Sequence, residues 1–199
     1  METNVGVIIQ SRTGSIRFPN KVFEMLGDKP LIGHVINIGK KVARKVVLAA
    51  PISDNGKFDK ICEEHKIEVV YDRTHDDNDV VGRFIVAAHT FGIETIVRLC
   101  GDAPFLSPFV VRSAVKMHLT RKADYTVTRG FPEGMNAEVF NISLLEKFQS
   151  VMDNEEKEHV TLYFERHAKD IQTNIFWFNK MSIDTKEDLE NAQKWIKLL

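Results

Sequence analysis

A basic segment follows the first apolar run of the chain. The run covers residues 5–10, and the next eleven residues, Ser11–Lys21, include Arg12, Arg17 and Lys21. The small residues of the segment are Ser11, Gly14 and Ser15. Backbone N–H groups and cations in such a loop can bind the oxygens of a polyphosphate. Because the segment contains no acidic residue to neutralise it, phosphate binding is favoured over a solvated basic turn.

The basic segment differs from the common nucleotide-binding motifs. It matches neither the phosphate-binding loop G-x-x-x-x-G-K-[ST] nor the dinucleotide motif G-x-G-x-x-G. The second apolar run ends at Ala49-Ala50-Pro51, without the acidic residue that holds a dinucleotide ribose. The pattern therefore argues against a nicotinamide-dependent dehydrogenase.

Two carboxylates occupy positions where a metal ion could bind. Asp102 directly follows the apolar run 95–100, and Asp184 precedes a helical pattern near the end of the chain. Ligands of open α/β sheets bind beyond the carboxyl ends of the strands, so Asp102 is expected to face the basic segment and could hold Mg²⁺ against substrate phosphates. A simple turn at Asp102, and a helix N-terminal role for Asp184, remain as alternatives.

Other kinds of catalytic site find no support in the spacing of the residues. His159 and His167 are eight residues apart, about 12 Å along a helix and too far to bind one metal ion. H-E-x-x-H and the G-x-S-x-G nucleophile motif are absent. Cys62 and Cys100 are far apart in the sequence, so both are expected to be buried and reduced.

Alternating strand and helix patterns must position these side chains. Strands are predicted for residues 5–10, 45–50, 68–71 and 95–100, which are rich in β-branched residues, and helices for 31–42, 58–62, 80–91 (capped by Asp79) and 107–121. In the second half, strands are predicted for 124–128, 137–141 and 171–178, and helices for 143–146 onward (with a capping box), 155–166 and from Thr185. The fold class is therefore α/β, with helices on both faces of a mostly parallel central sheet in a three-layer sandwich.

Length and charge restrict the class of protein. The 199 residues favour a single domain, 1–199, and 27 basic against 28 acidic residues give a net charge of -1. That balance gives no electrostatic support for nucleic acid or a membrane surface as a partner. No apolar run approaches the ~20 residues that span a bilayer, and no signal-peptide pattern is present, so a soluble, cytoplasmic protein is expected.

Six segments together resemble one protein family. They are Val7–Val22, Asp79–Phe84, Arg98–Pro104, Gly134–Phe140, Glu158–Thr161 and Ser182–Leu189. Their order and composition resemble bacterial sugar cytidylyltransferases, closest to the spore coat polysaccharide biosynthesis protein F branch. That branch is similar to CMP-3-deoxy-manno-octulosonate synthetases and to acylneuraminate cytidylyltransferases.

The resemblance implies a fold of the nucleotide-diphospho-sugar transferase type and an activity. A cytidylyltransferase of this kind would transfer CMP from CTP to a sugar or sugar acid with Mg²⁺ and release pyrophosphate, in surface polysaccharide biosynthesis; a homodimer is one assembly to test. The implied nucleotide-binding residues are Gln10, Ser11, Arg12, Gly14, Ser15, Arg17, Lys21, Ala50, Asp79, Arg83 and Asp102. Arg12, Lys21 and Asp102 would be catalytic, Asp102 and Asp184 would bind the metal, and the acceptor would contact Asn136, Glu138, His159 and Thr161.

The sequence departs from the family pattern at three positions. Asn136 replaces a usual Asp, Leu162 a usual Pro and Asn20 a common Gly. Two other functions remain as alternatives: a nucleotide-sugar glycosyltransferase, whose D-x-D metal motif is missing at Leu99-Cys-Gly-Asp102, and a non-catalytic nucleotide-binding module of the same fold. Release of pyrophosphate from CTP would separate the cytidylyltransferase from both.

Overall fold

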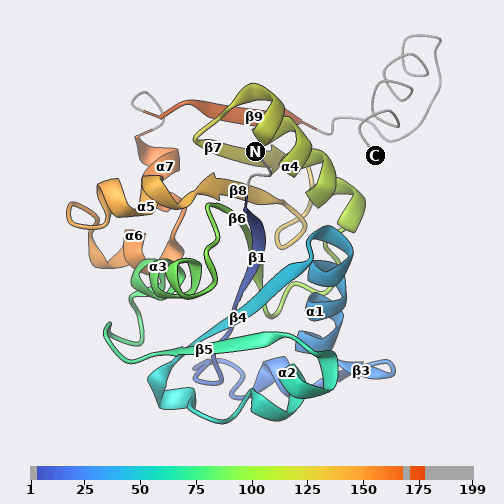
Figure 1. The fold of residues 1–199 in the computed structure, drawn as a ribbon. Helices are drawn as coiled ribbons and strands as arrows, with labels where there is room; N and C mark the ends of the chain where they lie inside the picture. Colours follow the sequence, from blue (N-terminus) through green and yellow to red (C-terminus); the bar gives the residue numbers. More distant parts are fainter. Residues whose placement is uncertain (1–3, 168–170, 178–199) are drawn as a thin grey trace, which may run out of the picture.

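A seven-stranded sheet runs through the molecule in the order β5-β4-β1-β6-β8-β7-β9 (Figure 1). The computed structural model describes residues 4–167 and 171–177. The strands are β1 (Val5–Gln10), β4 (Lys45–Pro51), β5 (Glu68–Asp72), β6 (Thr95–Cys100), β7 (Tyr125–Arg129), β8 (Glu138–Asn141) and β9 (Thr173–Trp177). β8 is antiparallel to β6 and β7, whereas the other pairings of this sheet are parallel. The predicted mostly parallel central sheet is confirmed.

Helices cover both faces of the sheet, which gives the expected three layers (Figure 1). One face carries α1 (Leu31–Val42), α2 (Asp59–His65) and α4 (Pro108–Arg121). The other carries α3 (Val80–Phe91), α5 (Ile142–Phe148), α6 (Asn154–His159) and α7 (Leu162–Arg166). The short elements are the 3₁₀ turns η1 (Lys21–Phe23) and η2 (Ile52–Asp54) and the hairpin strands β2 (Met25–Leu26) and β3 (Lys29–Pro30).

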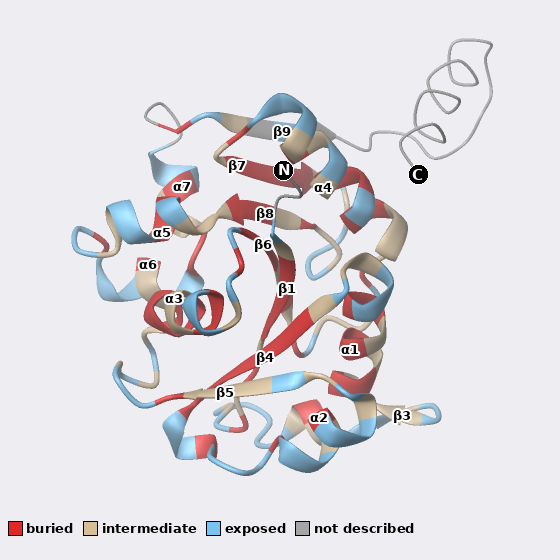
Figure 2. Cartoon of the chain, in the orientation of Figure 1, coloured by how far each residue is buried: buried red, intermediate tan, exposed pale blue. Residues whose placement is uncertain are grey.

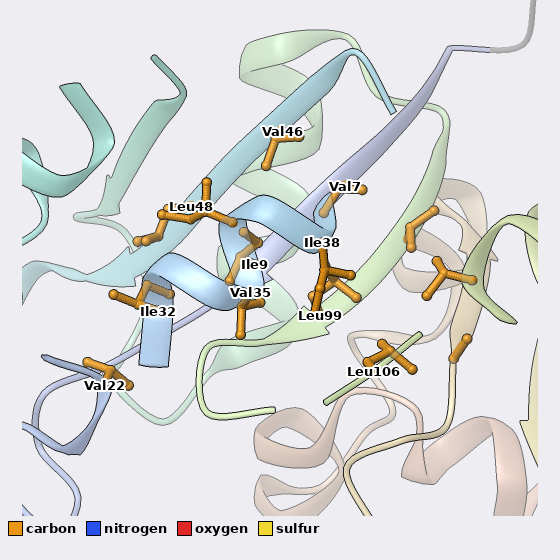
Figure 3. Packing of buried hydrophobic residues seen from close by; sticks show 14 of the residues in the cluster. Val7, Ile9, Val22, Ile32, Val35, Ile38, Val46, Leu48, Leu99 and Leu106 are labelled. Carbon is orange, nitrogen blue, oxygen red and sulfur yellow. The ribbon is translucent and has the colours of Figure 1, made fainter. Parts of the chain in front are cut away.

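The apolar residues of the central strands are buried on both sides. In β1, Val7 and Ile9 join the core beneath α1 and α4, and Ile8 joins the core beneath α3; none of the three has exposed surface. Figure 3 shows Val35 and Ile38 of α1 packed against the first of these groups. Burial on this scale, visible as the buried strands in Figure 2, is the main favourable contribution to folding. The two cores fix the strand ends that carry the site.

Several predicted elements agree closely with the structure. The bounds of β1 and β6 and of helices α1 and α3 match the sequence patterns, and Asp79 caps α3 by accepting a hydrogen bond from the backbone N–H of Gly82 at 2.7 Å. The helix expected from Thr185 lies outside the described residues, as does Asp184. No helix in the described part of the chain has the length and apolar character needed to cross a membrane.

Two predictions in the second half are wrong. The capping box expected at Ser143–Glu146 is absent, because α5 begins at Ile142 with Asn141 as its N-cap; the box forms instead between Asp153 and Glu156 at the start of α6. The single helix expected over 155–166 is divided at Val160, whose φ of 52° and ψ of -59° cannot continue a helix. Leu162 then begins α7.

Candidate functional site

The site is a cavity at the carboxyl ends of the two central strands β1 and β6. These strands are adjacent and parallel, with Gln10 opposite Cys100, so the segments that follow them leave the sheet side by side. The cavity has a volume of about 610 Å³ and is the size of a small-molecule site. It is lined by Gln10, Ser11, Arg12, Ser15, Ile16, Arg17, Lys21, Val22, Val80, Arg83, Arg98, Cys100, Gly101, Asp102, Glu133, Glu158 and His159.

The basic segment after β1 is held in shape by Thr13. The Thr13 carbonyl accepts hydrogen bonds from the backbone N–H groups of Ser15 and Asn20, both at 2.9 Å. The Thr13 N–H donates at 2.7 Å to Asp54, which is 2% exposed. Asn20 has φ 59°, a left-handed conformation that Gly and Asn adopt most readily, which gives a physical reason for either residue at this position.

Two of the three cations of this segment, Arg12 and Lys21, have acidic partners that lie far away in the sequence. Arg12 donates from Nη2 to Glu158 Oε1 and from Nη1 to Asn78 Oδ1, both at 2.9 Å. Lys21 forms an ion pair with Asp102. The expectation that Asp102 faces the basic segment is therefore confirmed. Although the segment itself contains no acidic residue, the fold brings carboxylates from distant segments to Arg12 and Lys21.

Arg83 enters the cavity from the first turn of α3. It is 2% exposed, and its Nη2 donates to the backbone carbonyl of Asp77 at 2.6 Å. Burial lowers the pKa of this guanidinium, although nearby Asp72 and Asp77 oppose the shift. An arginine with few anionic contacts at a cavity wall is suited to an anionic or electron-rich ligand.

A second arginine, Arg98, lies on the floor of the cavity inside a network of hydrogen bonds. It pairs with Glu138 of β8, and its Nε donates to Gln10 Oε1 at 2.9 Å. Glu138 Oε1 also accepts from the hydroxyls of Thr161 at 2.7 Å and Tyr125 at 3.2 Å. Burial would raise the pKa of Glu138, but the Arg98 charge and these hydrogen bonds outweigh it, so the pKa lies below its ordinary value.

Ser11 carries a hydroxyl that no protein group satisfies. The residue is 6% exposed and lines the cavity, and its Oγ has no hydrogen-bond partner among the described residues. Gly101 lies directly against it, because a Cβ at that position would be 2.6 Å from Ser11 Oγ. A buried, unsatisfied hydroxyl is costly, and a ligand oxygen in the cavity would satisfy it.

The family-model comparison decides the assignment of this fold. The model described as cytidylyltransferase matches residues 6–196. The chain belongs to the cytidylyltransferase family. The resemblance that the six sequence segments indicated is thereby confirmed.

Individual relatives agree with the cytidylyltransferase assignment. The chain is 29% identical to the spore coat polysaccharide biosynthesis protein SpsF of Bacillus subtilis (strain 168), over 94% of this chain and 83% of that protein. A solved cytidylyltransferase from Leptospira borgpetersenii superposes on this chain with a TM-score of 0.77 at 26% identity. The match covers 99% of this chain and 92% of the Leptospira chain. The fold is also that of CMP:2-keto-3-deoxy-manno-octonic acid synthetase complexed with CTP, with a TM-score of 0.69, 15% identity, and 98% and 99% coverage.

Most of the sequence-predicted residues meet at the cytidylyltransferase cavity. Those lining it are Gln10, Ser11, Arg12, Ser15, Arg17, Lys21, Arg83, Asp102 and His159. Gly14, Ala50 and Asp79 do not line it: Gly14 is exposed, Ala50 is fully buried in β4, and the Asp79 carboxylate caps α3. Glu138 and Thr161 lie behind the floor, where they hold Arg98. Asn136 is outside the lining, and its buried Oδ1 has no partner among the described residues.

Several lining residues were not assigned from the sequence. Arg98, Glu133 and Glu158 are charged and line the cavity, and Cys100, expected to be buried, is half-buried there. A signal for Arg98 did exist, because a cation inside the otherwise apolar strand Thr95–Cys100 needs a partner or a ligand. Glu158 gave no such signal, since an acidic residue in a polar helical stretch is ordinary.

Asp102 is one of three described carboxylates that line the cavity and could contact a metal ion, together with Glu133 and Glu158. It lies at the cavity, and its hard oxygen donors suit Mg²⁺, which usually takes one or two protein carboxylates together with substrate phosphates and water. No group of three metal-ligating side chains is found in the described part of the chain. The donor set therefore fits an ion held partly by substrate.

Proposed function

We propose that this cytidylyltransferase, as a single domain over residues 1–199, transfers CMP from CTP to a sugar or sugar-acid acceptor and releases pyrophosphate. The observation that carries the proposal is the cavity beyond β1 and β6, which is lined by Arg12, Arg17 and Lys21 and by Asp102, the ion-pair partner of Lys21. A cavity rich in cations with a facing carboxylate suits a triphosphate that binds with a divalent ion. Surface polysaccharide biosynthesis, named for the SpsF relative, is the proposed context, and the cytoplasm the proposed location.

The proposed reaction is an in-line displacement at the α-phosphorus of CTP. The acceptor oxygen forms the new bond to phosphorus, its proton leaves, and the bond to the bridging oxygen breaks to release pyrophosphate. Such a step needs alignment and charge neutralisation more than a protein nucleophile. Arg12 and Lys21 neutralise the charge that develops on the pyrophosphate. Ser11 Oγ, unpaired and buried, offers a further hydrogen bond to a nucleotide oxygen.

The proposed metal is Mg²⁺, held by Asp102 and by Asp184, which lies outside the described residues. When bound, Mg²⁺ neutralises phosphate charge and activates the attacking hydroxyl. Because Asp102 is paired with Lys21 in the free protein, Lys21 must exchange this carboxylate for phosphate as substrate binds. Asp102 thus keeps Lys21 near the position where it is needed.

The acceptor is proposed to bind near His159, which is exposed at the cavity. Arg98, Glu138 and Thr161 form the floor beneath that region through their shared hydrogen bonds.

Pyrophosphate release tests the proposal. The protein is incubated with CTP, Mg²⁺ and a panel of nonulosonic and related sugars chosen by thermal shift, since a ligand of the native state raises the melting temperature. Asp102→Asn is expected to lower the rate on the order of 100-fold, because it removes a charge at the reacting phosphates. The control is Glu63→Gln, at an exposed position of α2 away from the cavity. Full Mg²⁺-dependent pyrophosphate release by Asp102→Asn would contradict the assignment of Asp102.

A further inference from the structure

Arg12 connects two neighbouring segments beside the cavity, which Lys157 and Asp79 also join at 3.8 Å. Its Nη1 reaches Asn78, in the loop between β5 and α3, and its Nη2 reaches Glu158, near the end of α6, each at 2.9 Å. Both Arg12 and Glu158 line the cavity. The main proposed phosphate ligand of the loop is therefore already engaged by a carboxylate when no nucleotide is bound.

The fold fixes the position of Glu158. Two residues later, Val160 has φ 52° and ψ -59°, and the N–H of Thr161 donates to the carbonyl of His159, which makes a strained γ-turn. The Val160 side chain has no exposed surface, and Thr161 is 4% exposed and bonded to Glu138. A β-branched residue stays in this conformation only where its surroundings hold it there. The carboxylate that meets Arg12 is thus presented from an anchored segment.

The cavity also contains a carboxylate in a different situation. Glu133 lines it but is exposed and forms no ion pair with any residue in 4–167 or 171–177. Glu158 by contrast occupies a guanidinium N–H that a phosphate oxygen would use, since both are anionic oxygen acceptors of the same geometry. Glu133 and Glu158 therefore carry the same charge and line the same cavity, but only Glu158 contacts Arg12.

We propose that Glu158 is a positioning residue that holds Arg12 in the nucleotide-free protein and is exchanged for a phosphate oxygen when a triphosphate binds. Affinity for the triphosphate is then reduced by the free energy of the Arg12–Glu158 contact, because a ligand must compete with it. The ion pair is partly exposed, with side chains 41% and 38% accessible, so its contribution is modest. The identity of the ligand as a nucleotide rests on the proposed function; the exchange itself requires only a triphosphate group.

A double-mutant cycle measures this exchange. Binding of inorganic triphosphate and, separately, of CTP is followed by calorimetry with Mg²⁺ at low ionic strength, where screening is weakest. Glu158→Gln is expected to bind inorganic triphosphate about two- to fivefold more tightly than the wild type, in proportion to an exposed ion pair. In the Arg12→Gln background the same substitution is expected to give a smaller gain, no larger than the general effect of removing one negative charge, because the competing contact has already been removed.

Glu133→Gln is the matched control for the general effect of removing one negative charge. Its gain in affinity is expected to be equal with and without Arg12. The proposal is overturned if the Glu158→Gln gain is also independent of Arg12, if Glu158→Gln weakens binding, or if inorganic triphosphate binds none of the proteins. Should inorganic triphosphate follow the cycle while CTP does not bind, the exchange stands and the proposed function fails. Melting temperatures of all variants establish that they are folded.

Discussion

Asp54 is the residue on which the shape of the basic segment Ser11–Lys21 depends. Its carboxylate accepts hydrogen bonds from the backbone N–H and the hydroxyl of Thr13 and from Lys57 Nζ, the last at 2.7 Å. Burial would raise the pKa of Asp54, but the bonds from Lys57 and Thr13 outweigh it and hold the pKa below its ordinary value. Because Thr13 in turn closes the loop through its carbonyl, Asp54 acts on the cavity without lining it.

Asp54→Asn is therefore expected to weaken triphosphate binding as well as stability. Asn keeps the size of Asp but replaces one acceptor oxygen by a donor, so one of the bonds to Thr13 or Lys57 is lost at a cost of about 2 kcal/mol. Urea unfolding and calorimetry with inorganic triphosphate measure the two effects. Asp59→Asn, on the neighbouring α2 and bonded to Tyr71, serves as the control. Unchanged triphosphate affinity in folded Asp54→Asn would show that the loop keeps its shape without this carboxylate.

The charged residues of the site show how far the sequence alone could reach. Arg12, Lys21 and Asp102 were identified because strand ends are where an α/β sheet binds ligands. Asp102 was also expected to face the basic segment, but Glu158 was not, since it lies 146 positions from Arg12 and the type of residue does not reveal which cation it will meet. Asp54 is equally ordinary in sequence and acquires its role only through burial against Thr13.

Among the elements, those with strong local signals agreed with the sequence. Helices α1 and α3 have apolar residues at helical spacing, and α4 begins at Ser107-Pro108, a favoured helix start. The division of 154–166 into α6 and α7 has no local signal, because packing of Val160 in the core imposes it. The two-residue strands β2 and β3 are too short to show a period at all.

The loop before α3 packs closely against the helix at Gly82, where there is no room for a larger residue. A Cβ at Gly82 would lie 2.4 Å from the ring of His75, which is held by Asp72 at 2.9 Å. Gly82→Ala is expected to lower the free energy of unfolding by about 1–3 kcal/mol, because the ring must move. The loss is expected to be smaller when His75→Ala removes the ring.

Urea unfolding of the wild type, the two single variants and the double variant gives the four free energies of unfolding that this comparison needs. Gly14→Ala is the control, because a Cβ there would meet nothing within 4 Å, and its effect should stay within about 0.5 kcal/mol. If Gly82→Ala costs the same with and without His75, the close contact between them is not the cause.

For the molecule as a whole, the net charge is close to zero, although many charged side chains gather at one cavity. The chain carries 27 basic and 28 acidic residues, yet the cavity joins cations and carboxylates from segments throughout it. Arg12 meets Glu158, Lys21 meets Asp102, and Arg98 meets Glu138. The first two pairs have both side chains in the cavity lining, whereas in the third, 12% and 15% exposed, Arg98 lines the floor and Glu138 lies behind it. The free protein thus pairs cavity cations with its own carboxylates, and in the exchange proposed above a more highly charged ligand replaces the partners of Arg12 and Lys21.

Folding stability is expected to fall as the pH drops below about 6.5, in part through His118. This residue is 1% exposed, with Nδ1 at 3.1 Å from Thr126 Oγ1 and Nε2 at 3.1 Å from Asn141 Oδ1. Asn141 donates its amide to the Ala123 carbonyl, so its Oδ1 accepts from His118 Nε2–H, and Nδ1, beside the Thr126 hydroxyl, is the nitrogen that would take up a proton. Burial lowers the pKa of His118 below its ordinary value of about 6.5, although the hydrogen bond with Asn141 opposes the shift.

Proton binding at His118 determines the direction in which folding stability changes with pH. Below pH 6.5 the unfolded chain binds a proton at His118 that the folded protein does not, so stability is complete above that pH and is lost as the pH falls toward the folded pKa. One such group contributes up to about 1.4 kcal/mol per pH unit. His65, whose pKa burial also lowers, adds to the slope in the same direction. Urea unfolding between pH 7.5 and 5 measures how the free energy of unfolding changes with pH. This change should be smaller for His118→Gln than for the wild type, and exposed His89→Gln serves as the control. If all three proteins show the same change, other groups cause the pH dependence.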